Sequence, residues 1–375
     1  MAHILVNGIS AKSGGGRSIL TNFLTILKAR GSLHNFTVIV PDDVSYGGHA
    51  GPSVQLLPIP WLSKTALLPV VNTLVLPKLV QRGGYDLVLN LADIPIPTET
   101  RQVFLFDWSY AAFPESIAWQ RARCADNLKR RLKMHFFRRY LRYVDVMIAQ
   151  GPAIRDRLQR LYGMSQLHVI PNAVALDNLS AGDPHDFALG DGFKLLCLSQ
   201  YYSHKNLEVL IDVAELIRER SIDLKIVLTI AASQGPGARR LIKAIADRNL
   251  GGIIVNVGPV PMPRAPSLYQ QTDALLLPTL LESFSGTYVE AMFHGKPIFT
   301  SDYEFANDVC HDAAFYFDPL NAYDILRVVS QAIETPELIA FKIAAGRKRL
   351  AAMPDWNQAF GAYMALIDSV LEDKK

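Results

Sequence analysis

Short apolar runs alternate with longer amphipathic stretches along most of this chain. Strands are predicted at 3–7, 36–40, 85–90, 102–106, 144–149 and 168–172, and again at 194–199, 224–230, 252–258, 273–278, 296–300 and 313–317. Helices are expected to about residue 30, from residue 206, around 237–248, around 286–294, and over the last part of the chain. Apolar strands separated by helices indicate α/β sheets that are parallel and covered on both faces.

The stretch 176–192 is rich in Asp, Gly and Pro and divides the strands into two sets. We therefore predict a Rossmann-like, doubly wound domain over 1–175, a linker over 176–192, and a second such domain over 193–354 that faces the first. Ligands of open α/β sheets bind outside the carboxyl ends of the strands. Two facing domains predict a binding cleft between them.

Composition excludes several other classes of protein. Half of the residues are hydrophobic and 19% are charged, which is enough apolar material for a full core and argues against a mainly disordered chain. The three cysteines are too widely spaced for a disulfide framework or a CxxC metal site. Cys197 and Cys310 lie in apolar runs, so buried thiols and a reducing compartment are expected. No signal peptide or membrane-spanning helix is predicted, which favours a cytoplasmic protein.

The charge is concentrated in one segment. Nine Lys or Arg and one acid lie between Arg121 and Arg142. Apolar residues recur at helical spacing among them, namely Leu128, Leu132, Phe136, Phe137, Tyr140 and Leu141. One interpretation is a surface helix whose apolar stripe packs into the core. The other is a patch that contacts anionic lipid or an anionic substrate. Nucleic acid is not an expected partner, because no recognition motif accompanies the patch.

Three glycines, Gly14, Gly15 and Gly16, lie between the first predicted strand and the first helix. Glycines let a backbone approach a ligand closely, and a helix N-terminus offers amide donors to an anion. Their contiguous spacing is not a dinucleotide fingerprint, and a plain turn remains the alternative. Further along, Lys205 precedes Asn206, a predicted helix N-cap. A lysine at the positive end of a helix dipole is expected to pair with a bound anion, or else to be a plain exposed lysine.

The strongest candidate stretch is PTLLESFSGTYVEAMFHGKPIF at 278–299. Glu282 lies in a loop after a predicted strand, and Glu290 lies on the helix that begins near Gly286. Small residues at the helix start leave amides available for a phosphate. The two carboxylates would accept hydroxyl donors of a sugar. Gly295 is predicted to end this helix.

This stretch resembles the motif of two glutamates separated by seven residues in retaining glycosyltransferases of family 4. The longer segment 257–302 resembles the donor-domain core of that family, and HKN at 204–206 resembles its lysine motif. IPN at 170–172 and SGGGR at 13–17 resemble its interdomain entry and its N-terminal glycine loop. The resemblance implies the GT-B fold, with a final helix over 355–375 that crosses back to the first domain. It also implies that no metal or other cofactor is bound.

The resemblance assigns roles to individual residues. Lys205 would bind the donor phosphates, Glu290 the nucleotide ribose, and Glu282 the donor sugar. The implied donor-binding residues are Gly15, Gly16, Gln200, Lys205, Glu282, Phe284, Ser285, Gly286, Thr287 and Glu290, and the implied catalytic residues are Lys205, Glu282 and Asp107. At two positions the sequence departs from the family. Gln200 stands where an arginine is frequent, with Arg264 a speculative substitute, and Phe106 stands where a histidine precedes Asp107.

The sequence thus predicts a glycosyltransferase that retains the anomeric configuration. It would move a sugar from a nucleoside diphosphate sugar to a hydroxyl of a glycan or lipid-linked acceptor, in bacterial polysaccharide or lipopolysaccharide biosynthesis. A lipid-linked acceptor would place the protein at a membrane surface. The alternatives are a non-catalytic binder or scaffold for sugar nucleotides, which Gln200 and Phe106 motivate, and an epimerase. Trp61, Trp108 and Tyr110 would either stack on acceptor sugars or pack in the core.

Overall fold

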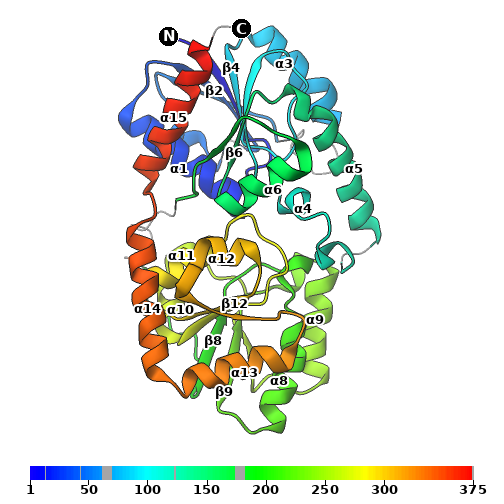
Figure 1. The fold of residues 1–375 in the computed structure, drawn as a ribbon, viewed down its shortest axis with the longest axis vertical. Coiled ribbons are helices and arrows are strands. Elements are labelled where there is room, and N and C mark those ends of the chain that lie inside the picture. The colour runs from blue at the N-terminus through cyan, green and yellow to red at the C-terminus, as the bar shows by residue number, and fades with distance from the viewer. Residues whose placement is uncertain (13, 43, 61–69, 122–123, 174–181, 374–375) are drawn as a thin grey trace. The chain divides into compact units, whose positions relative to one another are not determined.

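The computed structural model describes all residues except 13, 43, 61–69, 122–123, 174–181 and 374–375 (Figure 1). The chain forms two compact units. The first comprises Met1–Pro114, Arg123–Ala173 and Pro354–Lys375, and the second comprises Glu115–Ala122 and Val174–Met353. Trp61 and part of the predicted linker lie outside the described residues.

The first unit is built on a seven-stranded parallel sheet of order β3-β2-β1-β4-β5-β6-β7. Its strands are β1 (His3–Asn7), β2 (Asn35–Val40), β3 (Val54–Pro58), β4 (Leu87–Asn90), β5 (Arg101–Leu105), β6 (Val146–Ala149) and β7 (Leu167–Val169). Its helices are α1 (Gly14–Arg30), α3 (Leu76–Gly83), α4 (Ser109–Ala112), α5 (Cys124–Tyr140), α6 (Pro152–Tyr162) and α15 (Trp356–Glu372). The C-terminal helix α15 packs on α1, where the rings of Phe23 and Phe360 lie 5.2 Å apart.

The second unit is built on a six-stranded parallel sheet of order β10-β9-β8-β11-β12-β13. Its strands are β8 (Phe193–Cys197), β9 (Leu224–Leu228), β10 (Ile254–Asn256), β11 (Ala274–Leu277), β12 (Ile298–Ser301) and β13 (Ala314–Phe317). Its helices are α8 (Val209–Glu219), α9 (Pro236–Asp247), α10 (Ala265–Gln271), α11 (Gly286–Phe293), α12 (Glu304–Cys310), α13 (Ala322–Ile333) and α14 (Pro336–Ala351).

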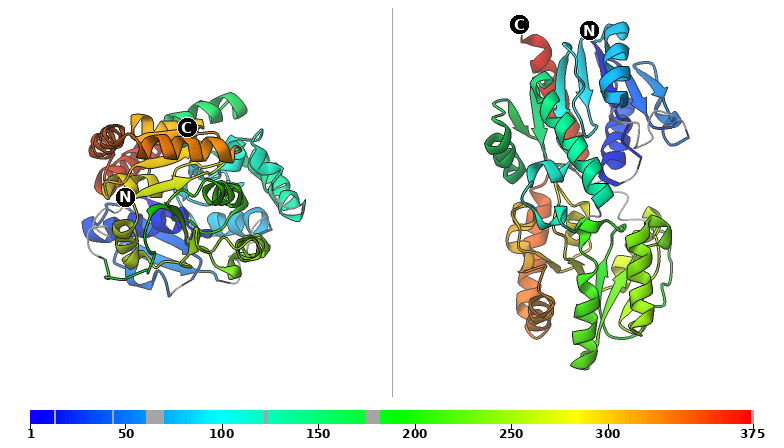
Figure 2. Two further views of the ribbon diagram at one scale, coloured as in Figure 1. Left: turned by 90° about the horizontal axis from the view of Figure 1, so that it is seen from below. Right: turned by 90° about the vertical axis from the view of Figure 1, so that its right-hand side faces the viewer.

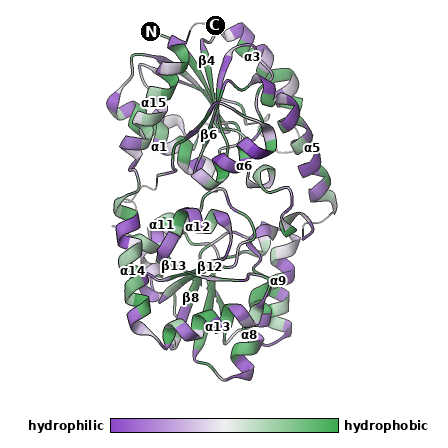
Figure 3. Cartoon of the chain, in the orientation of Figure 1, coloured by the Kyte–Doolittle hydropathy of each residue, from purple (hydrophilic) through white to green (hydrophobic). Residues whose placement is uncertain are grey.

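Each sheet lies between two layers of helices (Figure 2). The strands are mostly hydrophobic, whereas the helices carry both hydrophobic and hydrophilic residues (Figure 3). The prediction of two parallel α/β sheets covered on both faces is therefore confirmed. Cys197 and Cys310 are fully buried, as expected, and burial raises the pKa of both thiols. No helix among the described residues is long and apolar enough to cross a bilayer.

The structure corrects three local predictions. The sequence pattern does not predict strand β3, because it is an edge strand whose residues are mostly only partly buried or exposed and which is flanked by Gly and Pro. The glycines at 14–16 form the first turn of α1 rather than a loop before it, and Gly14 has a φ of +60°. Asn206 is not a helix N-cap. It adopts a left-handed conformation (φ 56°), and α8 begins only at Val209.

The face of the basic helix that packs into the core differs from the predicted one. Helix α5 begins at Cys124, so Arg121 precedes it. Phe137, Tyr140 and Leu141 are buried as predicted, but Leu128 and Leu132 are 70% and 49% exposed. The first two of the six residues in the predicted apolar stripe are therefore exposed, whereas Phe136 is half-buried. The inner face of α5 is completed instead by the buried Met134 and the half-buried Arg130 and Lys133.

Candidate functional site

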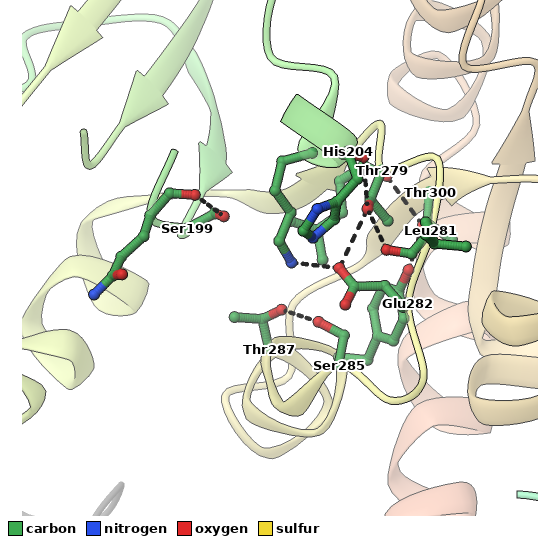
Figure 4. A network of polar contacts seen from close by, with 12 residues as sticks. Ser199, His204, Thr279, Leu281, Glu282, Ser285, Thr287 and Thr300 are labelled. Atoms are coloured by element: carbon green, nitrogen blue, oxygen red, sulfur yellow. Dashed lines mark hydrogen bonds and ion pairs between the residues drawn. The ribbon is translucent and has the colours of Figure 1, made fainter. Parts of the chain in front are cut away.

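An ion pair joins two loops at the carboxyl edge of the second sheet. Lys205 ends a short 3₁₀ turn (Ser203–Lys205) after β8, and Glu282 lies in the loop after β11. The Lys205 Nζ atom forms an ion pair with Glu282 Oε1, and the two side chains are only 15% and 11% exposed (Figure 4). The pair brings together the two residues that the sequence assigned to phosphate and sugar.

Backbone and hydroxyl groups support this pair (Figure 4). The Leu280 N–H donates to the carbonyl oxygen of His204 at 2.7 Å, which ties the two loops directly. The buried Thr279 hydroxyl lies 3.2 Å from Glu282 Oε1 and 3.2 Å from the same His204 oxygen. Because the loops are held by these contacts, the carboxylate and the ammonium group are preorganised before any ligand arrives.

The N-terminus of α11 lies next to the pair in sequence and in space (Figure 4). The helix begins at Gly286, as predicted, and Ser285 occupies the N-cap position without capping it. The Ser285 hydroxyl instead bonds the Thr287 hydroxyl at 2.7 Å. The helix ends as predicted, since Gly295 follows the C-cap with a φ of +63°. An uncapped N-terminus beside a lysine is an arrangement that suits a phosphate group.

Glu290 lies further along α11 and is held by a buried tyrosine. Tyr269 of α10 donates its hydroxyl proton to Glu290 Oε2 at 3.0 Å. Burial raises the pKa of Glu290, while the hydrogen bond from Tyr269 acts in the opposite direction. Nothing in the sequence pattern singled out Tyr269, because its contact with Glu290 depends on the packing of α10 against α11.

Three further candidate residues of this unit, Gln200, Phe284 and Arg264, are not part of the Lys205–Glu282 ion pair. Gln200 is exposed and accepts a hydrogen bond from the Tyr202 hydroxyl at 3.1 Å, within its own loop. The described contacts do not join it to Lys205 or Glu282. Phe284 lies in the loop between Glu282 and α11 and is half-buried. Arg264 ends a short 3₁₀ turn and is exposed.

Sequence reasoning missed one contributor to this edge, the segment Glu115–Ala122. It lies between two elements of the first unit in the chain, yet it packs with the second unit. Arg121 donates to the side-chain oxygen of Asn206, and Ser116 donates to the Leu280 carbonyl at 3.4 Å. Asn206 directly follows Lys205, and Leu280 lies two residues before Glu282. No local pattern could have shown this, because the contacts span 85 and 164 residues of chain.

The remaining predicted residues lie together in the first unit. Asp107 follows β5, and its Oδ1 atom accepts a hydrogen bond from Gln150 Nε2 at 3.1 Å. A Cβ atom on Gly15 would lie 3.8 Å from Asp107 Oδ2. Gly16, on the first turn of α1, would meet only the backbone of Ala11, at 3.9 Å. The carboxyl edge of the first sheet thus joins the glycines to Asp107, as their positions after β1 and β5 imply.

Cations cover the aromatic side chains near Asp107. Lys133 forms an ion pair with Asp93 and lies over the Trp108 ring, with Nζ 4.2 Å from its centroid. Arg130 lies over the Tyr110 ring at 4.1 Å. Trp108 and Tyr110 are only 9% and 5% exposed, so they pack in the core rather than offer a face to sugars.

The described residues contain no group of three or more His, Cys, Asp or Glu that could hold a metal ion. The cation that faces Glu282 is Lys205. At the edge of the second sheet, an ammonium group and helix amides can bind an anion, and two carboxylates can accept hydrogen bonds from hydroxyl groups.

Two family models match this chain. Residues 186–349 match glycosyl transferases group 1, and residues 13–178 match Glycosyltransferase Family 4. D-inositol 3-phosphate glycosyltransferase of Paenarthrobacter aurescens (strain TC1) is 26% identical over 160 residues, 40% of this chain and 39% of that protein. The putative glycosyltransferase EpsF of Bacillus subtilis (strain 168) is 28% identical over 192 residues, 47% of each. The matched parts thus span less than half of these curated relatives.

Solved structures are similar over nearly the whole chain. A glycosyltransferase from Rickettsia africae ESF-5 has a TM-score of 0.73 at 15% identity and covers 100% of this chain and 99% of that one. Anabaena Alr3699/HepE in complex with UDP-glucose has a TM-score of 0.71 at 18% identity, over 98% and 100% of the two chains. WaaG, a glycosyltransferase involved in lipopolysaccharide biosynthesis, has a TM-score of 0.70 at 14% identity, over 96% and 98%.

Proposed function

We propose that this chain, which belongs to the group 1 and family 4 glycosyltransferases and has their GT-B fold, transfers a sugar from a nucleoside diphosphate sugar to an acceptor hydroxyl. The observation that carries the proposal is the Lys205–Glu282 ion pair beside the uncapped N-terminus of α11. The complex of Anabaena HepE with UDP-glucose supports the class of donor.

The diphosphate of the donor binds Lys205 and the first amides of α11. A lysine ammonium group has three protons, so Lys205 can keep its contact with Glu282 and still donate to phosphate oxygens. Glu282 accepts a hydroxyl of the donor sugar through its second oxygen. Ser285, Gly286 and Thr287 form the start of the helix, and Phe284 directly precedes them in the chain. We assign Gln200, in the loop after β8, to the donor as well.

The nucleotide ribose binds Glu290. One of its oxygens, Oε2, already accepts the hydrogen bond from Tyr269. The other, Oε1, accepts no hydrogen bond from the described residues and is the acceptor for ribose hydroxyls. Ribose recognition favours the ionised carboxylate, because protonation turns one of its two oxygens into a hydrogen-bond donor.

The transfer step places negative charge on the departing diphosphate. Lys205 and the α11 amides stabilise that charge, and one such preorganised donor supplies about 3–4 kcal/mol of transition-state stabilisation. We assign this role to them and not to a metal ion. The departing phosphate takes the proton of the acceptor hydroxyl as the new glycosidic bond forms. The anomeric configuration is retained, so an α-linked donor yields an α-linked product.

The acceptor is a glycan or lipid-linked hydroxyl compound, recognised through the first unit. Asp107 is the carboxylate that accepts an acceptor or donor hydroxyl there, and Gly15 and Gly16 allow a ligand to approach the backbone. WaaG acts in lipopolysaccharide biosynthesis. Its similar fold supports a polysaccharide or lipopolysaccharide acceptor for this chain.

An anionic membrane surface is the second proposed partner. Leu128, Leu132, His135 and Arg139 recur at helical spacing on α5, and all four are exposed. Exposed Lys129, Arg131 and Arg138 flank them. Two exposed leucines within a basic surface are complementary to anionic lipid, because leucine enters the interface while the cations contact headgroups.

The test is turnover of a panel of nucleoside diphosphate sugars by the full chain, measured as donor hydrolysis and as transfer. Turnover of one donor supports the proposal. Nucleotide binding by calorimetry without any product would instead favour a non-catalytic binder, which Gln200 and Phe106 motivate. A folded protein that neither binds nor turns over any donor would contradict both.

A further inference from the structure

The side chain of Tyr269 lies beneath the helix that carries Glu290. Tyr269 is 0% exposed, and its hydroxyl lies 3.0 Å from Glu290 Oε2 and 3.4 Å from the backbone oxygen of Thr287. A tyrosine hydroxyl has one proton. The shorter distance and the carboxylate acceptor mean that this proton is donated to Glu290.

The ring of Tyr269 cannot move independently of α11. It stacks on the His294 ring, with centroids 4.6 Å apart and planes 17° apart. His294 directly follows α11, and its backbone N–H donates to the carbonyl oxygen of Glu290 at 3.0 Å. The Tyr269 hydroxyl and the Glu290 carboxylate are therefore both held by contacts with the last turn of α11 and the His294 that follows it.

We infer that Tyr269 is a positioning residue for donor binding, which holds Oε2 of Glu290 so that Oε1 faces the ribose hydroxyls. This inference rests on the proposed function. Tyr269 acts through Glu290, and its loss removes the orientation of the carboxylate while the carboxylate itself remains. The effect falls on nucleotide affinity and not on the chemical step, which depends on Lys205 and the α11 N-terminus.

The arrangement also determines how nucleotide affinity depends on pH. Burial raises the pKa of Glu290, and the Tyr269 hydroxyl counteracts that rise by stabilising the carboxylate. Among the described residues, titratable and charged groups near this turn include His294 and Lys296 after α11 and Arg347 of α14, which lies near Gly295. Burial lowers the pKa of His294, so it stays neutral near pH 7. Removing the Tyr269 hydroxyl raises the pKa of Glu290 further.

The experiment uses the full chain with the nucleotide sugar that the donor panel selects and with its free nucleoside diphosphate. For Tyr269→Phe we expect KM for the donor and Kd for the diphosphate to rise about tenfold, and kcat to change less than twofold. Nucleotide affinity should fall as the pH is lowered from 8 to 5, and in Tyr269→Phe this fall should begin at a higher pH than in the wild type. Tyr316→Phe is the matched control, because it removes another tyrosine hydroxyl of the second unit, which bonds the backbone of His311.

The inference would be overturned if Tyr269→Phe had the wild-type donor KM and lost nucleotide affinity at the same pH as the wild type. If that variant unfolds in the assay, Glu290→Asp replaces it. The shorter aspartate side chain loses the hydrogen bond from Tyr269 but keeps the negative charge of the carboxylate. Wild-type affinity in Glu290→Asp would also overturn the inference. A wild-type chain that turns over no donor fails the proposed function instead, so the two failures are distinguishable.

Discussion

The Lys205 ammonium group is paired with the Glu282 carboxylate, 77 residues further along the chain. Each group is nearly buried, and each compensates the charge of the other. Breaking a buried pair by removing one partner leaves an uncompensated charge, which costs several kcal/mol. The pair therefore serves the fold of the two loops as well as the binding of a donor.

Replacement of Lys205 tests the pair directly. In Lys205→Ala we expect kcat/KM for the donor to fall by about 10²–10³, because the main cation for the diphosphate is lost. Turnover and thermal unfolding of the purified variant measure the two consequences. Lys243→Ala is the control, since it removes a lysine from an exposed ion pair with Asp247 in the same unit. Equal turnover in both variants would contradict the role of Lys205.

Glu290→Gln should stabilise the fold and weaken donor binding. Burial raises the pKa of Glu290 in the folded state, so its ionised form destabilises the fold at pH values above that pKa. A neutral amide avoids this cost and still accepts from Tyr269. We expect a melting temperature about 2–4 °C higher at pH 8, with the gain disappearing as the pH falls below about 4.3. Thermal unfolding against pH checks this, and a lower melting temperature at pH 8 would contradict it. Donor KM should rise.

Asp107→Asn should slow transfer without weakening the nucleotide. Glu290, Lys205 and the first amides of α11, which are assigned above to the ribose and the diphosphate, lie in the second unit, whereas Asp107 bonds Gln150 in the first. We expect transfer to fall at least tenfold and the Kd of the nucleoside diphosphate to change less than twofold. Asp156→Asn, at an exposed ion pair with Arg155, is the control. Transfer at the wild-type rate would remove Asp107 from the site.

Arg121→Ala should loosen the turn next to Lys205. Asn206 is fully buried, and loss of Arg121 leaves its side-chain oxygen without that donor, at a cost of about 1–3 kcal/mol. We expect donor KM to rise severalfold, measured with the panel donor. Asn206→Gly, which keeps the left-handed conformation, should have a smaller effect than Asn206→Ala. Arg239→Ala, an exposed arginine that bonds a backbone oxygen, is the control.

Substitutions on the outer face of α5 should reduce membrane binding. Reversing Arg131 and Arg139 to Glu removes two cations, each contributing about 1 kcal/mol near an anionic surface. We expect at least tenfold weaker co-sedimentation with vesicles that contain phosphatidylserine, and further loss in Leu128→Ser with Leu132→Ser. Leu161→Ser, at another exposed leucine of the first unit, should bind as the wild type. If the wild-type chain co-sedimented equally with neutral vesicles and with vesicles that contain phosphatidylserine, charge complementarity would be contradicted.

Most of the fold could be predicted because its signals are local. Buried parallel strands are apolar throughout, so twelve of the observed strands appear as short hydrophobic runs. Strand β3 is not predicted because it is an edge strand whose Gln55 and Pro58 are exposed, so no continuous apolar run marks it. The inner face of α5 could not be predicted, because Arg130 and Lys133 lie over aromatic rings on that face. On this helix, a charged residue therefore does not identify the face that meets solvent.

The sequence by itself determined the strand–loop–helix units and the residues that follow their strands, including Lys205, Glu282 and Asp107, and it placed Glu290 on the helix after the Glu282 loop. Residues after parallel strands gather at one edge of a sheet whatever the rest of the chain does. Only the tertiary structure decided which side chains meet: Lys205 with Glu282, Tyr269 with Glu290, and Arg121 with Asn206. Such contacts depend on how distant elements pack, and packing is set by the shapes of many side chains at once rather than by any short pattern.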